Sequence, residues 1–456
     1  MKKILVMILA VAVLASALVI TASAANYEEA ALQLNELDLF RGTDVGFELD
    51  RAPRRDEAVA MLVRFLGLEE ESQSGEYTHP FTDVPDWADG YVAIAFEKGY
   101  TTGVTDTTFN PSGLCSAQMY VTFILRALGY SDDSVTTDLW TEAIAFGKQV
   151  GVIDDILLSG TFLRGNMTAV SYLALSVPPA DGEYDCLLEK LVAEEAVDTG
   201  KAAPVLDLFN LLGEFNEINA KSNKETNIEM SMAIDMNATY MGETMPGNIN
   251  IDIAMIIDND DIKMALVMEG SAAGEDIDMT MYIVDGLLYI GSEDAKLKLS
   301  LGDSSEIGMG DLFALTDISE MAGMSDNPIY MIKSLTKSSQ GGLTVYSIEI
   351  SGGSMTAIVE QVFAMVSENM DLGEIGDIAI GDISMSYYID NDGALKQLDM
   401  SIDMSMDVEG SPMSMQMTMK CEIVAVGDSV KLVFPDDLDT YMDLFEALAA
   451  ALAAEA

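Results

Sequence analysis

The spacing of hydrophobic residues changes once along this chain, near Thr226, and this change constrains the fold more than any other feature. Before Thr226, apolar residues recur every three or four positions, which is the period of amphipathic helices. After it they alternate with polar residues, without a slip from Ile228 to Tyr240 and again over 413–423. Such alternation predicts long antiparallel strands with one apolar and one solvated face. The expected fold class is therefore α + β multidomain, with an all-α N-terminal bundle and a curved antiparallel β-sheet in the C-terminal half.

The helical half contains an internal repeat. Trp87 and Trp140 are separated by nearly the same length of chain as Gly99 and Gly151, a period of about 50 residues. A helix, a loop and a closing helix thus recur about three times. The expected units are a signal peptide at 1–24, three degenerate repeats within 25–178 (about 25–68, 80–130 and 135–178), a helical linker at 179–225, a methionine-rich antiparallel β domain at 226–436 and a C-terminal helix at 437–456.

The first residues are typical of an export signal. Lys2 and Lys3 precede a continuous apolar run, which ends in the small-residue pattern Ala22-Ser23-Ala24. A positive start, an apolar centre and such a cleavage site predict a secretory signal peptide, with an uncleaved anchor helix as the alternative. No other stretch approaches the roughly 20 apolar residues that span a bilayer. We therefore expect a secreted protein with no membrane insertion after signal cleavage.

The charge of the chain limits its partners. It has 76 acidic and 23 basic side chains and a formal net charge of −53, so nucleic acid and anionic membrane surfaces are disfavoured. All seven arginines lie between Arg41 and Arg164. Arginine is the side chain best suited to bidentate recognition of an anion. An anion site, if present, is expected in the N-terminal half.

Residues for catalysis and metal binding are scarce. His79 is the only histidine, and no nucleophile motif, zinc motif or phosphate-binding glycine loop occurs. We predict no enzyme, no cofactor and no metal site. The three cysteines have no Cys-x-x-Cys spacing, and one Cys115–Cys186 disulfide is left open.

Methionine is concentrated in the second half, since 26 of the 31 methionines follow Lys201. They are core residues of the sheet in the simplest interpretation, because a period of two already explains their spacing. The alternatives are an apolar-ligand cavity, which the adaptable thioether chain would suit, and a copper(I) site. Two helical stretches, at 310–324 and 355–370, are expected to lie on the apolar face of the sheet.

The repeats resemble a known family. The second repeat resembles the S-layer homology (SLH) repeat in Phe81-Thr-Asp-Val-Pro85, Trp87-Ala88, Gly103, Phe109-Asn-Pro111 and Leu128-Gly129. Residues 39–58 and 162–165 resemble parts of the first and third copies, so the resemblance covers about a third of the chain. It implies a three-pronged bundle that binds a pyruvylated secondary cell-wall polymer without a covalent bond. The C-terminal half is weakly similar to the lipoprotein-carrier-like half-barrel of exported bacterial proteins.

The resemblance also implies the binding residues. Its Thr-Arg-Ala-Glu motif, whose arginine meets the acidic sugar, corresponds to Arg55 and Glu57 in the first repeat and to Arg164 in the third. The second repeat contributes Asp83 and Trp87 but has Cys-Ser-Ala-Gln at 115–118, without the arginine.

Elementary chemistry supports such a site, because an arginine and free N–H groups at a helix N-terminus suit a carboxylate. Other interpretations remain open. Arg55 pairs with Glu57 in one of them, Asp83 caps a helix in another, and Trp87 and Trp140 are buried packing residues in a third.

Together these observations predict a secreted bacterial protein held non-covalently on the cell wall by SLH repeats, which displays an acidic β-rich domain at the cell surface. Two alternatives remain. One is an extracytoplasmic carrier or sensor whose second half binds an apolar ligand, and the other is a structural S-layer component.

Overall fold

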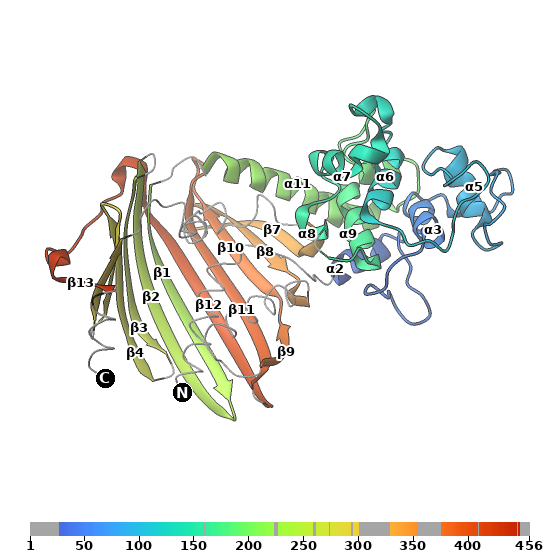
Figure 1. The fold of residues 1–456 in the computed structure, drawn as a ribbon. Coiled ribbons are helices and arrows are strands. Elements are labelled where there is room, and N and C mark those ends of the chain that lie inside the picture. The colour runs from blue at the N-terminus through green and yellow to red at the C-terminus, as the bar shows by residue number, and fades with distance from the viewer. Residues whose placement is uncertain are drawn as a thin grey trace.

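The computed structural model of the protein describes residues 27–444, except 159, 223–226, 259–260, 273, 293–294, 301–328, 354–374 and 409, together with residue 446. The signal peptide expected at 1–24 and the helices expected at 310–324 and 355–370 lie outside these residues. Figure 1 shows a helical N-terminal half standing beside one edge of a strongly curved antiparallel sheet. The predicted α + β fold class is confirmed.

The helical half consists of amphipathic helices around one core, most of them short and α11 (Thr199–Ser222) the longest of those described. Their closing helices begin where an extended residue turns into the helix, and polar side chains satisfy free N–H groups there. The Ser116 hydroxyl, for example, accepts a hydrogen bond from the Met119 N–H at 3.3 Å. The helices are α2 (Glu28–Glu36), α3 (Arg55–Phe65), α4 (Glu69–Ser72), α5 (Asp89–Glu97), α6 (Ala117–Ala127), η1 (Asp132–Ser134), α7 (Leu139–Val150), α8 (Asp155–Leu158), α9 (Arg164–Leu175), α10 (Leu187–Ala193) and α11 (Thr199–Ser222).

The described strands form a single sheet in the order β13-β6-β5-β4-β3-β2-β1-β12-β11-β10-β8-β7, with β9 paired to β11. Every pairing is antiparallel except that of β13 with β6. The strands are β1 (Ile228–Tyr240), β2 (Glu243–Asp258), β3 (Asp261–Ala272), β4 (Glu275–Val284), β5 (Leu287–Ser292), β6 (Lys296–Ser300), β7 (Ile332–Gln340), β8 (Leu343–Ile350), β9 (Ile375–Ile380), β10 (Ile383–Ile389), β11 (Leu395–Val408), β12 (Ser411–Val426) and β13 (Met442–Asp443), and η2 (Ile329–Met331) precedes β7.

The two faces of the sheet differ as the alternation predicts. In β12 the buried positions are Met413, Met415, Met417, Met419 and Cys421, whereas the residues between them are exposed. Cross-strand neighbours share a face, so the buried methionines of adjacent strands pack together in one core. The interpretation of methionine as a core residue of this sheet is confirmed. Helix α11 packs on the same face, because Phe215 lies edge-on to Tyr346 and Tyr387 at 5.2 and 4.9 Å between ring centroids.

The helical half and the sheet are joined by direct packing. Tyr330 in η2 is completely buried and donates a hydrogen bond to Asp154 Oδ2 at 2.9 Å. Its ring packs edge-on against Tyr27, at 5.5 Å between centroids. On α11, Glu214 forms an ion pair with Lys337 of β7. We call these contacts the junction, and they tie the helices to the β7 side of the sheet.

The expected C-terminal helix does not begin at residue 437. The described part of this region forms the 3-10 turn η4 (Leu438–Thr440), followed by β13 beside β6. The reason is tertiary packing: Phe434, Leu438 and Tyr441 lie on Tyr282 and Tyr289, on the face opposite the methionines. An ion pair between Asp437 and Lys296 holds the same segment, which we call the C-terminal strap (427–443). Residues 445 and 447–456 lie outside the described residues.

Replacing Tyr441 with alanine is expected to destabilise the end of the sheet. Tyr441 is 4% exposed and lies edge-on to Tyr289 at 5.4 Å, so its loss leaves a cavity under the strap. Amide hydrogen exchange should accelerate in β5 and β6 and remain unchanged in β11 and β12. The matched control is Met442→Ala, because Met442 is 52% exposed. Equal acceleration in both variants, or none in Tyr441→Ala, would contradict the packing role of the strap.

Candidate functional site

Three closing helices begin in the same way, and their first residues define the candidate site. The residues before α3, α6 and α9 are all extended: Arg54, Ser116 and Leu163. The first helical residues are therefore Arg55, Ala117 and Arg164. In the second repeat this moves the expected Thr-Arg-Ala-Glu position from 115–118 to 116–119, because Ser116 and not Cys115 caps the helix. The arginine is missing in either register.

The helix N-termini are not free anion cradles, which corrects the sequence-based argument. The N–H groups of Arg55 and Asp56 donate to the carbonyls of Gly113 and Pro111 at 2.8 and 3.1 Å, so the loop before α6 covers the start of α3. The start of α9 is covered in the same way. The N–H group of Arg164 donates to the Arg51 carbonyl and that of Gly165 to the Leu49 carbonyl, each at 2.9 Å. The repeats are thus interlocked, and any ligand here meets side chains.

Arg55 lies below the surface, with 6% of its area exposed. Its guanidinium lies over the Phe109 ring at 4.6 Å, Nη1 is 3.3 Å from Met119 Sδ, and Nη2 donates to the Thr102 carbonyl. Nε has no hydrogen-bond partner, and no described carboxylate is in ion-pair contact with the side chain. Burial lowers the pKa of Arg55, since no contacting anion compensates for the lost water. The proposed pairing of Arg55 with Glu57 is wrong.

Asp83 does not cap a helix and Trp87 is not buried, in contrast to two of the interpretations left open by the sequence. The Asp83 carboxylate accepts hydrogen bonds from the N–H groups of Phe109 and Asn110, both at 2.8 Å, so it fixes a loop and does not cap α5, which begins after Ala88. The bonds from Phe109 and Asn110 outweigh the effect of burial and lower its pKa. Trp87 is 47% and Trp140 is 43% exposed. The interpretation of both tryptophans as buried packing residues is wrong, and both rings are accessible to a ligand.

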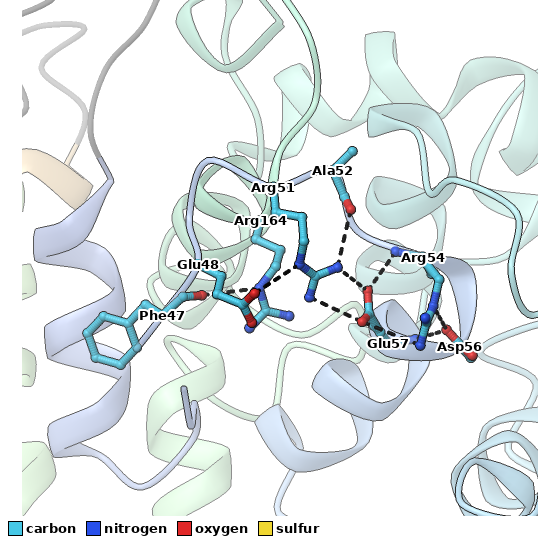
Figure 2. Close-up of polar contacts among 8 residues, drawn as sticks. All are labelled: Phe47, Glu48, Arg51, Ala52, Arg54, Asp56, Glu57 and Arg164. Atoms are coloured by element: carbon cyan, nitrogen blue, oxygen red, sulfur yellow. Dashed lines mark hydrogen bonds and ion pairs between the residues drawn. The ribbon is translucent and has the colours of Figure 1, made fainter. Parts of the chain in front are cut away.

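Glu57 and Arg164 meet in a cluster of charges between the first and third repeats (Figure 2). Glu57 binds Arg51 through both oxygens, with Nη1–Oε2 at 2.9 Å and Nη2–Oε1 at 3.1 Å. Its Oε1 also lies 3.5 Å from Arg54 Nη2, and its Oε2 accepts the Arg54 N–H at 2.9 Å. We call this set the inter-repeat cluster; it comprises Glu48, Arg51, Arg54, Asp56, Glu57 and Arg164.

Within the cluster the arginines differ in exposure. Arg164 is 7% exposed, and its Nε donates to the Phe47 carbonyl at 3.2 Å. The side chains of Arg51 and Arg54 are 36% and 44% exposed. Burial acts to raise the pKa of Glu57, but hydrogen bonds from Arg51 and Arg54 outweigh it, so the pKa lies below its usual value. The sequence interpretation missed Arg51 and Arg54, although their closeness to Glu57 along the chain was a usable signal.

Other candidate chemistry finds little support among the described residues. No three His, Cys, Asp or Glu side chains in the described part of the chain are placed to hold a metal ion. The three cysteines are buried and free, so the Cys115–Cys186 disulfide left open by the sequence is not formed. An apolar ligand or copper(I) for the methionine-lined face stays a prediction.

Comparison with known proteins identifies the repeat. Residues 80–116, which hold Asp83, Trp87 and the loop over Arg55, match the S-layer homology domain. The chain carries an SLH domain. Residues 214–439 match a family of unknown function, DUF6612, so this match takes in the end of α11 that contacts β7, as well as the sheet apart from β13.

Several proteins of similar sequence are surface proteins. The chain is 28% identical over 181 residues to a cell surface protein of Thermoanaerobacter kivui, covering 38% of this chain and 23% of that protein. It is 32% identical over 109 residues to the middle cell wall protein of Brevibacillus brevis, covering 23% of this chain and 10% of that protein. The chain thus spans less than a quarter of either relative. The SLH domain and these relatives support a secreted, S-layer-associated protein of the cell surface.

Solved structures resemble about half of the chain distantly. LprF from Mycobacterium bovis is 11% identical and covers 49% of this chain and 97% of its own, with a TM-score of 0.27. A domain described as an outer membrane lipoprotein-sorting protein from Vibrio parahaemolyticus covers 50% and 95%, with 10% identity and a TM-score of 0.15. At these TM-scores neither structure bears on the function of the sheet. Among the helices of the described residues, none has the length and apolarity to cross a membrane.

Proposed function

We propose that the SLH region binds an acidic secondary cell-wall polymer, a pyruvylated polysaccharide, without a covalent bond, and that the protein displays its acidic β domain on the bacterial surface. The observation that carries this proposal is the inter-repeat cluster. Three of the seven arginines of a chain with net charge −53 gather there, at a boundary between repeats. The proposal includes no enzymatic activity.

The residues proposed from the sequence form two groups. Glu57 and Arg164 belong to the inter-repeat cluster, whereas Arg55 and Asp83 make hydrogen bonds to the loop of residues 101–111. The accessible ring of Trp87 suits stacking against a sugar. We propose that these five residues shape the polymer-binding surface, with the buried arginines behind it.

The test is sedimentation of the full-length mature protein with purified walls. Walls that carry the polymer should remove most of the protein from solution, and walls stripped of the polymer should leave it there. Because ionic contacts are screened by salt, retention should weaken as the ionic strength rises. Absence of cosedimentation, or equal cosedimentation with stripped walls, would overturn the proposal.

A further inference from the structure

Burial separates the arginines of the candidate site into two pairs. Arg55 and Arg164, which hold the family's arginine position, are 6% and 7% exposed, and each donates to a backbone carbonyl of a loop. Arg51 and Arg54 keep 36% and 44% of their side chains exposed. A ligand in solution reaches the second pair without any rearrangement of the protein.

The exposed pair is held together by one carboxylate. Glu57 Oε1 is 3.1 Å from Arg51 Nη2 and 3.5 Å from Arg54 Nη2, so both guanidinium groups lie beside the same oxygen atom. Asp56, whose side chain is 3% exposed, fixes Arg54 from behind through Nε at 3.1 Å. Because Arg51 and Arg54 are already held in place, binding a ligand loses less side-chain conformational entropy than it would with two mobile arginines.

Donor capacity remains after these contacts. A guanidinium has five N–H groups. Arg54 uses Nε and Nη2 on Asp56 and Glu57, and its Nη1 has no partner among the described residues. The helix N-terminus adds nothing, since its first N–H groups donate to the carbonyls of Gly113 and Pro111.

We infer that Arg51 and Arg54, oriented by Glu57, make the direct contact with an anionic group of the wall polymer. Arg55 and Arg164 act behind them as positioning residues that hold the loops of neighbouring repeats. The ligand group is a carboxylate or a phosphate, since both present the paired oxygens that a guanidinium edge recognises. This inference rests on the proposed function and assigns the contact to Arg51 and to Arg54, which stands at the threonine position of the motif, in place of the motif's arginine.

The first test compares arginine variants by wall cosedimentation. Each charge-assisted hydrogen bond lost should weaken binding by about tenfold, so Arg51→Gln and Arg54→Gln should each show this loss. Binding is compared well below the Tm of every variant, because both arginines also hold Glu57 in the fold. Arg55→Lys should lower Tm and weaken binding less than either of them. The matched control is Arg41→Gln, which removes an exposed arginine that pairs with Glu69 outside the inter-repeat cluster and should bind like the wild type. Loss of binding in Arg55→Lys, with none in Arg51→Gln or Arg54→Gln, would overturn the inference. The proposed function would survive that result, and it fails only if the wild type does not bind.

A sharper test removes a negative charge. If net charge alone controlled binding of an anion, Glu57→Gln would bind more tightly. If Glu57 orients the two arginines, Glu57→Gln binds more weakly. The matched control is Glu48→Gln, which removes the same charge from the cluster but contacts only Arg51, at 3.5 Å. We expect weaker binding for Glu57→Gln and equal or tighter binding for Glu48→Gln; tighter binding in both would overturn the inference.

Chemical treatment of the walls decides whether the anionic group bound by Arg51 and Arg54 is a carboxylate or a phosphate. Mild acid removes ketal-linked carboxylates and leaves phosphates in place. Loss of binding after mild acid identifies a carboxylate, and binding that persists until the phosphate-bearing polymer is removed identifies a phosphate. Either result supports the inference, provided that Arg54→Gln no longer responds to the treatment that removes the group. For a carboxylate, Arg54→Gln should bind equally to walls with and without mild-acid treatment. For a phosphate, it should bind equally to walls with and without the phosphate-bearing polymer. A difference that persists in Arg54→Gln would overturn the inference.

Discussion

Replacing Tyr330 with alanine is expected to lower the free energy of unfolding by about 3–5 kcal/mol, as for other large aromatic side chains removed from a core. Tyr330 is completely buried at the junction, where it packs on Tyr27 and donates a hydrogen bond to Asp154. The cavity falls between the helical half and the sheet. In urea, the variant should therefore lose stability and unfold in two separated transitions, whereas the wild type unfolds in one.

The matched control is Tyr330→Phe, which keeps the ring and removes the hydroxyl group. It leaves the packing on Tyr27 intact, so its cost should be near that of one hydrogen bond, about 1–2 kcal/mol. Unfolding of Tyr330→Ala that matches the wild type would show that the two halves do not stabilise one another through η2.

Replacing Met417 with alanine should cost about 2–5 kcal/mol, the usual range for a large aliphatic side chain lost from a core. Met417 is 2% exposed at the centre of β12, between Met236 on β1 and Ile402 on β11. Chemical denaturation, followed by circular dichroism, measures the loss.

The control is its neighbour, Gln416→Ala. Gln416 lies on the solvated face of the same strand, beside Asn237 and Asp403, so its replacement should change stability by less than about 0.5 kcal/mol. Similar losses in the two variants would contradict the assignment of the faces.

The sheet was predictable because its signal is local. Each strand buries every second residue, and Met413–Cys421 follow this rule without a break, so burial can be read from the sequence. The C-terminal strap was not predictable in this way. The sequence predicts a helix from 437, but residues 438–443 form a turn and a short strand, because Tyr441 packs on Tyr289, which is distant in the chain.

For the candidate site, the sequence located the region but not the roles. The resemblance identified Arg55 and Arg164, and the structure buries both behind the loops of neighbouring repeats. Which arginine faces solvent depends on how the repeats interlock, and Arg54 and Arg55 are adjacent in sequence yet differ in exposure. The accessible rings of Trp87 and Trp140 show the same limitation, because a tryptophan is more often buried than not.

Both edges of the sheet have a neighbour within the same molecule. At one edge β13 of the C-terminal strap lies beside β6, and at the other the helical half stands beside β7 (Figure 1). Unpaired strand edges are the usual starting point for aggregation between copies of a β protein. At high local concentrations of the protein, these neighbours oppose the growth of one sheet into the next and keep the sheets of separate copies apart.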